Sequence, residues 1–168
     1  MDLDARRQTM VGRQIRERGI RDERVLSAFE RVPREAFVAV ADREQAYDDH
    51  PIPIGEGQTI SQPYIVARTL EALGLRGTER VLDVGTGSGY AAALLSLLVR
   101  EVVSIERIAP LAERARARLV ELGYPVEVVV GDGTLGAPAR APFDAIAVAA
   151  CAPAIPPALV SQLAPGGR

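Results

Sequence analysis

The sequence predicts an α/β fold in which a mainly parallel, doubly wound sheet follows an N-terminal helical region. Three observations predict it. After Gly77, short apolar runs alternate with amphipathic segments at helical spacing. The runs are apolar throughout, as expected for parallel strands covered on both faces. The first run leads through a glycine-rich turn into a helix, the place where such sheets bind ligands.

Bulk composition excludes several classes of protein. The chain has 168 residues, 48% hydrophobic and 25% charged, which is typical of one soluble globular domain. A net charge of −2 argues against nucleic acid or a membrane as the main partner. One cysteine and one histidine allow neither an internal disulfide nor a metal cluster. No signal peptide or membrane span is recognisable, so we expect a cytoplasmic location.

Within this single domain, residues 1–76 form the predicted helical and loop region. Its elements, in order, are helices over 4–18 and 22–32, an ordered loop rather than a regular strand over 47–62, and a helix over 63–73. Ser61 is the expected N-cap of the last helix, with Pro63 in its first turn and Gly74 as its stop.

Residues 77–168 form the predicted Rossmann-like portion, which contains the predicted ligand site. The expected strands cover 80–84, 101–105, 126–130 and 143–149, and the expected helices cover 90–98 and 110–122. The second helix has leucines and alanines on one face and charges on the other. Right-handed crossovers between parallel strands then give a Rossmann-like arrangement.

Acidic residues follow three consecutive predicted strands. Asp83 precedes the glycine turn of Gly85 and Gly87, Glu106 follows the second strand, and Asp132 follows the third. Glycines there allow close approach of a ligand, and a carboxylate after the second strand accepts ribose hydroxyls. Each acid alone also fits a solvated strand end, and the turn alone fits simple helix packing. Together they indicate a nucleoside site.

The spacing of the glycines bears on which nucleoside binds. A dinucleotide site favours G-x-G-x-x-G, whereas residues 85–89 read G-x-G-x-G directly after Val84 and Asp83. A carboxylate near the turn repels a pyrophosphate and attracts the ammonium and sulfonium of S-adenosylmethionine. The methyl donor is therefore favoured, and an NAD-binding domain remains the third, weaker reading.

With the upstream loop included, the sequence resembles the protein-L-isoaspartate O-methyltransferase family along nearly its whole length. The most specific stretch is residues 52–64, Ile-Pro-Ile-Gly-Glu-Gly-Gln-Thr-Ile-Ser-Gln-Pro-Tyr. Further matches are Val-Pro-Arg-Glu-Ala-Phe-Val at 32–38, Gly-Thr-Gly-Ser-Gly-Tyr at 85–90, Ser-Ile-Glu-Arg at 104–107, Gly-Asp-Gly at 131–133 and Ala-Pro-Phe-Asp at 141–144. The resemblance implies a Rossmann-like methyltransferase sheet.

The resemblance also implies an activity and a set of site residues. The enzyme would methylate the free carboxylate of isoaspartyl residues in damaged proteins and peptides, with Ser61 as the active-site serine. The implied donor-binding residues are Asp83, Gly85, Thr86, Gly87, Ser88, Glu106, Asp132 and Gly133. The implied substrate-binding residues are Ile54, Thr59, Ile60, Ala152 and Pro153. Ser61 also fits a helix cap, and Thr86 and Ser88 also fit turn-stabilising roles.

Two features depart from the family pattern. Ala137 stands where the family often has an aromatic residue, and the sequence stops at Arg168, where a further strand is expected. An open sheet edge exposes backbone donors and acceptors. We therefore expect lowered stability, association through that edge in place of the family's monomer, and weak turnover. The alternative function is an impaired fragment that binds S-adenosylmethionine without methyl transfer. His50 is expected at the surface, and Cys151 is expected to pack.

Overall fold

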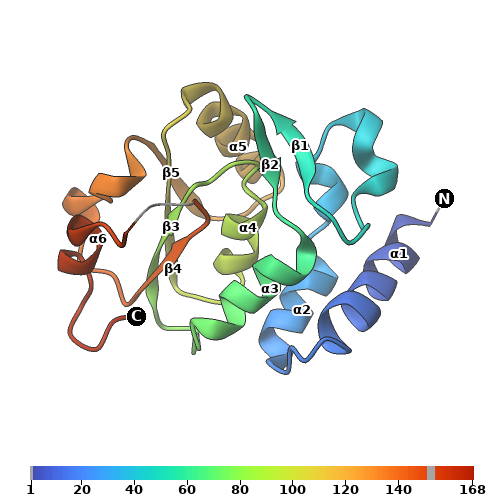
Figure 1. Cartoon of the computed structure of the whole chain (residues 1–168), viewed down its shortest axis with the longest axis horizontal. Helices are drawn as coiled ribbons and strands as arrows, with labels where there is room; N and C mark the ends of the chain where they lie inside the picture. The colour runs from blue at the N-terminus through green and yellow to red at the C-terminus, as the bar shows by residue number, and fades with distance from the viewer. Residues whose placement is uncertain (1, 151–153) are drawn as a thin grey trace.

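A four-stranded parallel sheet forms the centre of the chain (Figure 1). The computed structural model describes residues 2–150 and 154–168. The strands lie in the order β5-β4-β3-β6. Their bounds are Arg80–Val84 for β3, Glu101–Glu106 for β4, Val126–Val130 for β5 and Ala145–Val148 for β6. All four predicted strands are confirmed, and β3 and β5 have the predicted bounds.

The strand order creates a crevice between β3 and β6. The chain runs from β3 to β4 to β5 in one direction, through α4 (Tyr90–Ser96) and α5 (Ala109–Glu121). It then returns to place β6 on the other side of β3. Such a reversal leaves the carboxyl ends of the two neighbouring strands open between diverging connections, which is where doubly wound sheets bind ligands.

The two faces of the sheet are covered unequally. Val81, Val102 and Val128 point into the larger core, which α4, α5 and the N-terminal helices share. The opposite face carries a smaller cluster that includes Leu82, Val103 and Leu159. It is covered by α6 (Pro157–Ser161), which supplies Leu159 and contacts the 3₁₀ turn Gly133–Leu135; a second 3₁₀ turn, Pro138–Arg140, follows in the chain.

The N-terminal region packs against the sheet as a helical layer (Figure 1). It contains α1 (Leu3–Thr9), a π-helical continuation (Met10–Arg16), α2 (Glu23–Arg31), 3₁₀ turns at Arg34–Phe37 and Val40–Gln45, and α3 (Pro63–Ala72). The first predicted helix is thus real, but its second half has π geometry. The wide turns still bury the predicted apolar residues Met10, Val11 and Ile15.

The prediction of an ordered loop without a regular strand over 47–62 is wrong in part. Ile52–Gly55 (β1) and Gln58–Ile60 (β2) form an antiparallel hairpin. Its turn has positive φ at Gly55, Glu56 and Gly57, so the two glycines supply conformations that favour strand reversal. The prolines and glycines that suggested a loop instead mark a short edge strand and its turn.

The prediction that Ser61 caps α3 is also wrong. The N-cap is Gln62, whose side chain makes no capping bond. Its amide nitrogen donates to Asp49 Oδ1 at 2.9 Å. Pro63, in the first turn, lacks an N–H, which reduces the number of donors that a cap would satisfy. The Ser61 hydroxyl is therefore not committed to the helix.

The outer edge of β6 is partly paired by the last residues of the chain. Ile146 N donates to the Arg168 carbonyl at 2.9 Å, and Arg168 N donates to the Asp144 carbonyl at 3.1 Å. Phe143 makes a parallel bridge with Leu163. These contacts satisfy part of the backbone polar groups along this edge.

Candidate functional site

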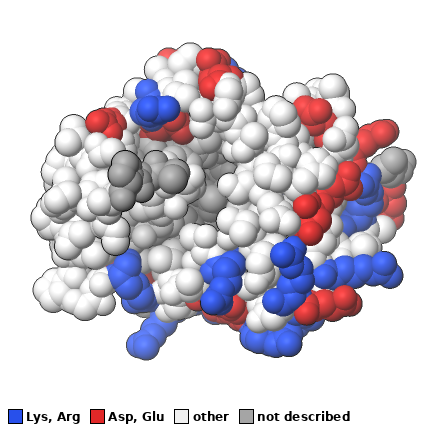
Figure 2. Space-filling model, viewed as in Figure 1, with Lys and Arg blue, Asp and Glu red and all other residues white. Residues whose placement is uncertain are grey.

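A cleft of about 770 Å³ opens at the carboxyl ends of the strands. Figure 2 shows this face of the molecule hollowed, while charged side chains gather over the N-terminal helices. The cleft is lined by β3, the glycine turn, the ends of β4 and β6, the turn after β5, and the segment from Gln58 through α3. Eleven of the predicted site residues line it: Thr59, Ile60, Ser61, Asp83, Gly85, Thr86, Gly87, Ser88, Glu106, Asp132 and Gly133.

The glycine turn lines the cleft with its backbone in a conformation that favours glycine. Gly85 and Gly87 both have positive φ, at 101° and 53°. Gly85 N donates to the Ile105 carbonyl at 2.9 Å, which ties the turn to β4. A Cβ on Gly85 would meet Ala149 at 3.6 Å, so the turn is in close contact with the end of β6. Side chains at these positions would strain the backbone and narrow the cleft.

Asp83 is the most deeply buried acid of the cleft, with 1% of its surface exposed. Ser104 Oγ donates to its Oδ2 at 2.7 Å. Loss of hydration on burial, together with the charge of Glu106, raises the pKa of Asp83 to about 7, against the lowering effect of the Ser104 bond. A buried carboxylate in this setting favours a cationic partner.

Glu106 holds the turn with both of its oxygens. Oε2 accepts from Gly87 N at 2.9 Å, and Oε1 accepts from Ile108 N at 3.0 Å. Because a carboxylate has about four acceptor positions, each oxygen retains capacity for a further donor. The position at the end of β4 therefore suits the hydroxyls of a ribose, as the sequence predicts.

Asp132 lies after β5 and is exposed to solvent. Its Oδ1 accepts from Thr134 N at 2.9 Å and from Thr134 Oγ1 at 2.7 Å. These bonds lower the pKa of Asp132. A Cβ on Gly133 would lie 2.6 Å from Val84 Cγ1, so this turn passes tightly over the end of β3. Asp132 and Glu106 thus border one end of the cleft.

The two hydroxyls of the glycine turn have partners within the protein. Thr86 Oγ1 lies 2.5 Å from Ser104 Oγ. Ser88 Oγ accepts from Tyr90 N at 3.3 Å, at the start of α4. The turn-stabilising reading of both residues is therefore supported by geometry, and donor contact stays a prediction.

The predicted substrate residues are divided by the structure. Thr59, Ile60 and Ser61 line the cleft opposite the acids. Ile54 is not among the lining residues, because it packs partly buried against the larger core and behind Gly87. Ala152 and Pro153, like Cys151, lie outside the described residues.

Sequence reasoning missed several lining residues. Ile65, Val66 and Thr69 of α3, together with Arg107 and Thr134, also border the cleft. The available signal was weak, since α3 reads only as an amphipathic helix. Ser104 was also missed, although a lone polar residue inside the apolar run of β4 marks it. Ala137 is buried beside Phe143 and Leu159, so this departure from the family affects the smaller core and not the cleft lining.

The charges of the cleft fit the predicted ligand. Arg107 is the one basic residue among its described lining residues, and it acts electrostatically on Asp132. Beside Asp83 the described lining holds no basic side chain, so an anionic pyrophosphate finds no counter-charge there. A ligand that carries an ammonium or sulfonium group and a ribose fits. In the described ranges, no three His, Cys, Asp or Glu side chains form a group able to hold a metal ion.

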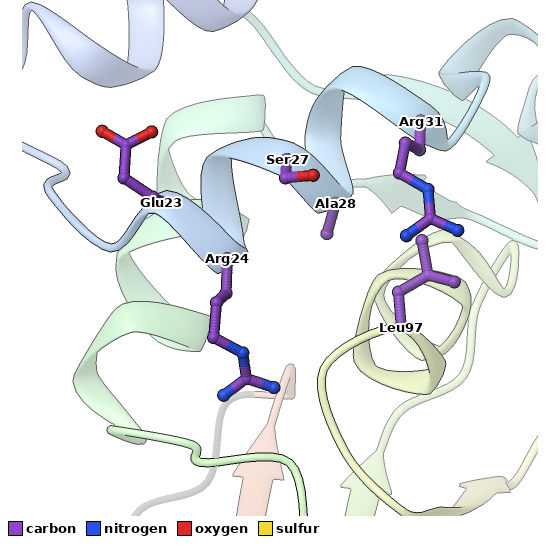
Figure 3. Close-up of a pocket in the computed structure, with 6 residues that line it drawn as sticks. All are labelled: Glu23, Arg24, Ser27, Ala28, Arg31 and Leu97. Carbon is purple, nitrogen blue, oxygen red and sulfur yellow. The ribbon is translucent and has the colours of Figure 1, made fainter.

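A second hollow of about 280 Å³ lies between α2 and the end of α4 (Figure 3). Arg24 at its rim donates to the carbonyls of Leu75 and Leu98. The guanidinium therefore ties helix ends together and is not free for a ligand. In Figure 3 the Arg31 side chain reaches toward Leu97. This hollow shares no lining residue with the cleft.

Nothing in the described ranges has the helical length and hydropathy required to cross a bilayer. The N-terminal helices and the sheet share one cluster of buried apolar residues, which begins at Met10 and ends at Ala147 in the sequence.

Comparisons with known proteins agree with this geometry. Residues 5–168 match the family model "Protein-L-isoaspartate(D-aspartate) O-methyltransferase". The chain is 62% identical to protein-L-isoaspartate O-methyltransferase 2 of Marinobacter nauticus, over 99% of this chain and 77% of the relative. It is 60% identical to the protein of the same name from Pelobacter propionicus, over 97% of this chain and 73% of the relative.

Two solved structures share the fold. A protein-L-isoaspartate O-methyltransferase aligns with a TM-score of 0.87 and 33% identity, over 96% of this chain and 53% of that one, so the chain spans about half its length. A Plasmodium falciparum protein of the same description, in complex with S-adenosyl-L-homocysteine, aligns with a TM-score of 0.81 and 26% identity, over 95% and 80%. The chain therefore belongs to the protein-L-isoaspartate(D-aspartate) O-methyltransferase family.

Proposed function

We propose that this chain transfers a methyl group from S-adenosylmethionine to the free carboxylate of isoaspartyl residues in damaged proteins. One observation carries the proposal: Ser61 and the acids Asp83, Glu106 and Asp132 line the same continuous cleft. Family membership supports the reaction type and the methyl donor. The NAD alternative is not favoured, because the matching family model and the similar relatives are those of methyltransferases.

The chain's own residues would hold the donor by complementary charge and hydrogen bonding. Asp83 attracts the ammonium and sulfonium groups, Glu106 accepts hydrogen bonds from the ribose hydroxyls, and Asp132 borders the adenine. When bound, S-adenosylmethionine supplies an electrophilic methyl group on a sulfonium. The buried position of Asp83 strengthens its electrostatic effect, because little water remains there to screen the carboxylate.

Ser61 is proposed to orient the substrate carboxylate. It is half-buried at the cleft wall between β2 and α3, and it does not cap α3. A carboxylate with a pKa of about 4 is ionised at neutral pH, so the reaction needs no general base. The serine then has one task, which is to hold a carboxylate oxygen about 3 Å from the methyl group and in line with its bond to sulfur.

The direct test pairs an isoaspartyl peptide with its normal aspartyl twin, both incubated with methyl-labelled donor. We expect label on the isoaspartyl peptide alone, and labelling that is about tenfold to a hundredfold slower in Ser61→Ala. Equal labelling of the two peptides contradicts the substrate assignment. Donor binding without transfer by the wild-type chain would favour the second candidate, a binding fragment that has lost turnover.

The remaining features of the proposal concern organisation. We propose one domain in which residues 1–76 supply the substrate loop and 77–168 the donor site, supported by the shared core. Association through the β6 edge stays a prediction, and sedimentation analysis at several concentrations tests it against a monomer. A cytoplasmic location is likewise proposed, in keeping with the sequence composition, and fractionation of cells that express the protein checks it.

A further inference from the structure

A hydrogen-bonded network of two hydroxyl groups and one carboxyl group connects β4 to the cleft. Ser104 is fully buried and does not line the cleft. Its Oγ lies 2.7 Å from Asp83 Oδ2 and 2.5 Å from Thr86 Oγ1. Both of these partners do line the cleft. Ser104 therefore connects two residues of the donor site from behind.

The number of available protons determines which group donates in each hydrogen bond of this network. A serine hydroxyl carries one proton, and Ser104 donates it to Asp83 when that carboxyl is ionised. Thr86 must then donate to Ser104, because the Ser104 proton is already used. Protonation of Asp83 makes it a donor and allows both hydroxyls to reverse. The state of the buried carboxyl thus determines the orientation of a hydroxyl at the cleft wall.

We propose that Ser104 is a positioning residue for the methyl donor, which keeps Asp83 an acceptor facing the cleft and orients the Thr86 hydroxyl. The inference rests on the donor site proposed above, and it adds a residue that touches neither donor nor substrate. Ser104 has no other hydrogen-bond partner among the described side chains, so its hydroxyl bonds only to Asp83 and Thr86 there.

The electrostatic surroundings make Asp83 sensitive to the loss of Ser104. Glu106, also on β4, is the charged group that acts on it, and its effect opposes ionisation. The paired residue on β6 is the apolar Ala147. With burial already raising the pKa of Asp83, the Ser104 bond is the stabilising contact for the ionised form. Without it, the pKa of Asp83 rises further, so a smaller fraction of the carboxyl is ionised at neutral pH and it attracts a cation less.

The experiment measures S-adenosylhomocysteine binding to the full chain by calorimetry between about pH 6 and 8.5. Ser104→Ala is expected to weaken binding about tenfold at pH 6 and about fivefold at pH 7, because a one-unit rise in the pKa of Asp83 lowers the ionised fraction by these factors. At about pH 8.5, where Asp83 is ionised in both proteins, the difference is expected to fall below about threefold. Ser104→Thr, which retains the hydroxyl, is expected to restore wild-type behaviour.

Two controls separate positioning from a general structural effect. Ser96→Ala removes a hydroxyl that bonds to the Ala93 carbonyl in α4, and is expected to change neither affinity nor its pH profile. Adenosine lacks the amino-acid part, so Ser104→Ala is expected to leave adenosine binding unchanged. Urea unfolding of each variant verifies that the fold is intact.

A second readout does not depend on the donor. The carbon-13 carboxyl resonance of Asp83, followed against pH, is expected to titrate about one unit higher in Ser104→Ala than in wild type. An unchanged titration, or a loss of affinity that is equal at all pH values, overturns the proposed role of Ser104 but leaves the proposed donor site standing. Failure of the wild-type chain to bind S-adenosylhomocysteine at any pH overturns the donor site itself, and this inference with it.

Discussion

Replacing Asp83 by asparagine is expected to stabilise the protein while weakening donor binding. The side chain is 1% exposed, and burial raises its pKa from 3.8 to about 7. Asparagine has nearly the same shape and still offers one oxygen to Ser104 Oγ, but it carries no charge to desolvate. The carboxylate therefore costs folding free energy, and the proposed reason for its presence is the cationic ligand.

The magnitude follows from the two pKa values. Between about pH 4 and pH 7 the unfolded chain has an ionised Asp83, whereas the folded chain keeps it protonated. The folded state then binds more protons, so this group lowers stability as pH rises, by about 1.4 kcal/mol per unit. Between pH 5 and pH 8 the stability of Asp83→Asn relative to wild type should increase by about 3 kcal/mol. Above about pH 7 the difference is constant.

Urea unfolding of the two proteins at pH 5 and pH 8 measures this increase. Asp132→Asn is the matched control, because Asp132 is exposed and the Thr134 bonds lower its pKa. Its difference from wild type should be the same at pH 5 and pH 8, because both values lie above the ordinary pKa of an aspartate, and a lowered pKa in the folded state changes stability only at lower pH. A pH-independent difference for Asp83→Asn would refute the reasoning. So would a variant that is less stable than wild type at pH 8.

Three further changes test other parts of the site. Ser61→Ala should lower methyl transfer about tenfold to a hundredfold, the equivalent of one charge-assisted hydrogen bond, with donor affinity unchanged by calorimetry. Glu106→Gln should weaken donor binding at least about tenfold and reduce stability by about 1–3 kcal/mol, because one of the N–H groups of Gly87 and Ile108 loses its acceptor. Gly133→Ala should destabilise by about 1–3 kcal/mol in urea unfolding, since its Cβ would lie 2.6 Å from a methyl group of Val84. Wild-type values for any of these variants contradict the corresponding role.

The sheet was predictable because its signals are local and agree with one another. Apolar runs in β3 and β5 have the predicted bounds, and turn glycines mark where strand passes to helix. Parallel connection then brings the residues after each strand to one edge. For this reason, Asp83, Glu106 and Asp132 could be placed in one cleft from sequence spacing alone.

The errors arose where composition permits two conformations. Residues 51–57 contain prolines and glycines that are equally typical of a loop and of a short edge hairpin, and only pairing with residues 58–60 decides between them. Ser61, two residues before Pro63, is typical of a helix N-cap, yet the N-cap of α3 is Gln62.

The parts of the site that depend on tertiary contacts could not be predicted from the sequence. A serine within an apolar strand gives no indication of its partners, and the contact of Ser104 with both Asp83 and Thr86 depends on the register of β3 against β4. In the same way, the lining from α3 depends on how that helix packs over the crevice, which helical spacing does not specify.

The central claim is that the acids at the strand ends and the glycine turn hold S-adenosylmethionine. A crystal structure of the chain grown with S-adenosylhomocysteine tests it most directly. We expect both ribose hydroxyls within hydrogen-bonding distance of Glu106, the amino group on the side of Asp83, and the adenine beside Asp132. A fully occupied ligand elsewhere on the surface, with this cleft empty or filled by a phosphate, would contradict the claim.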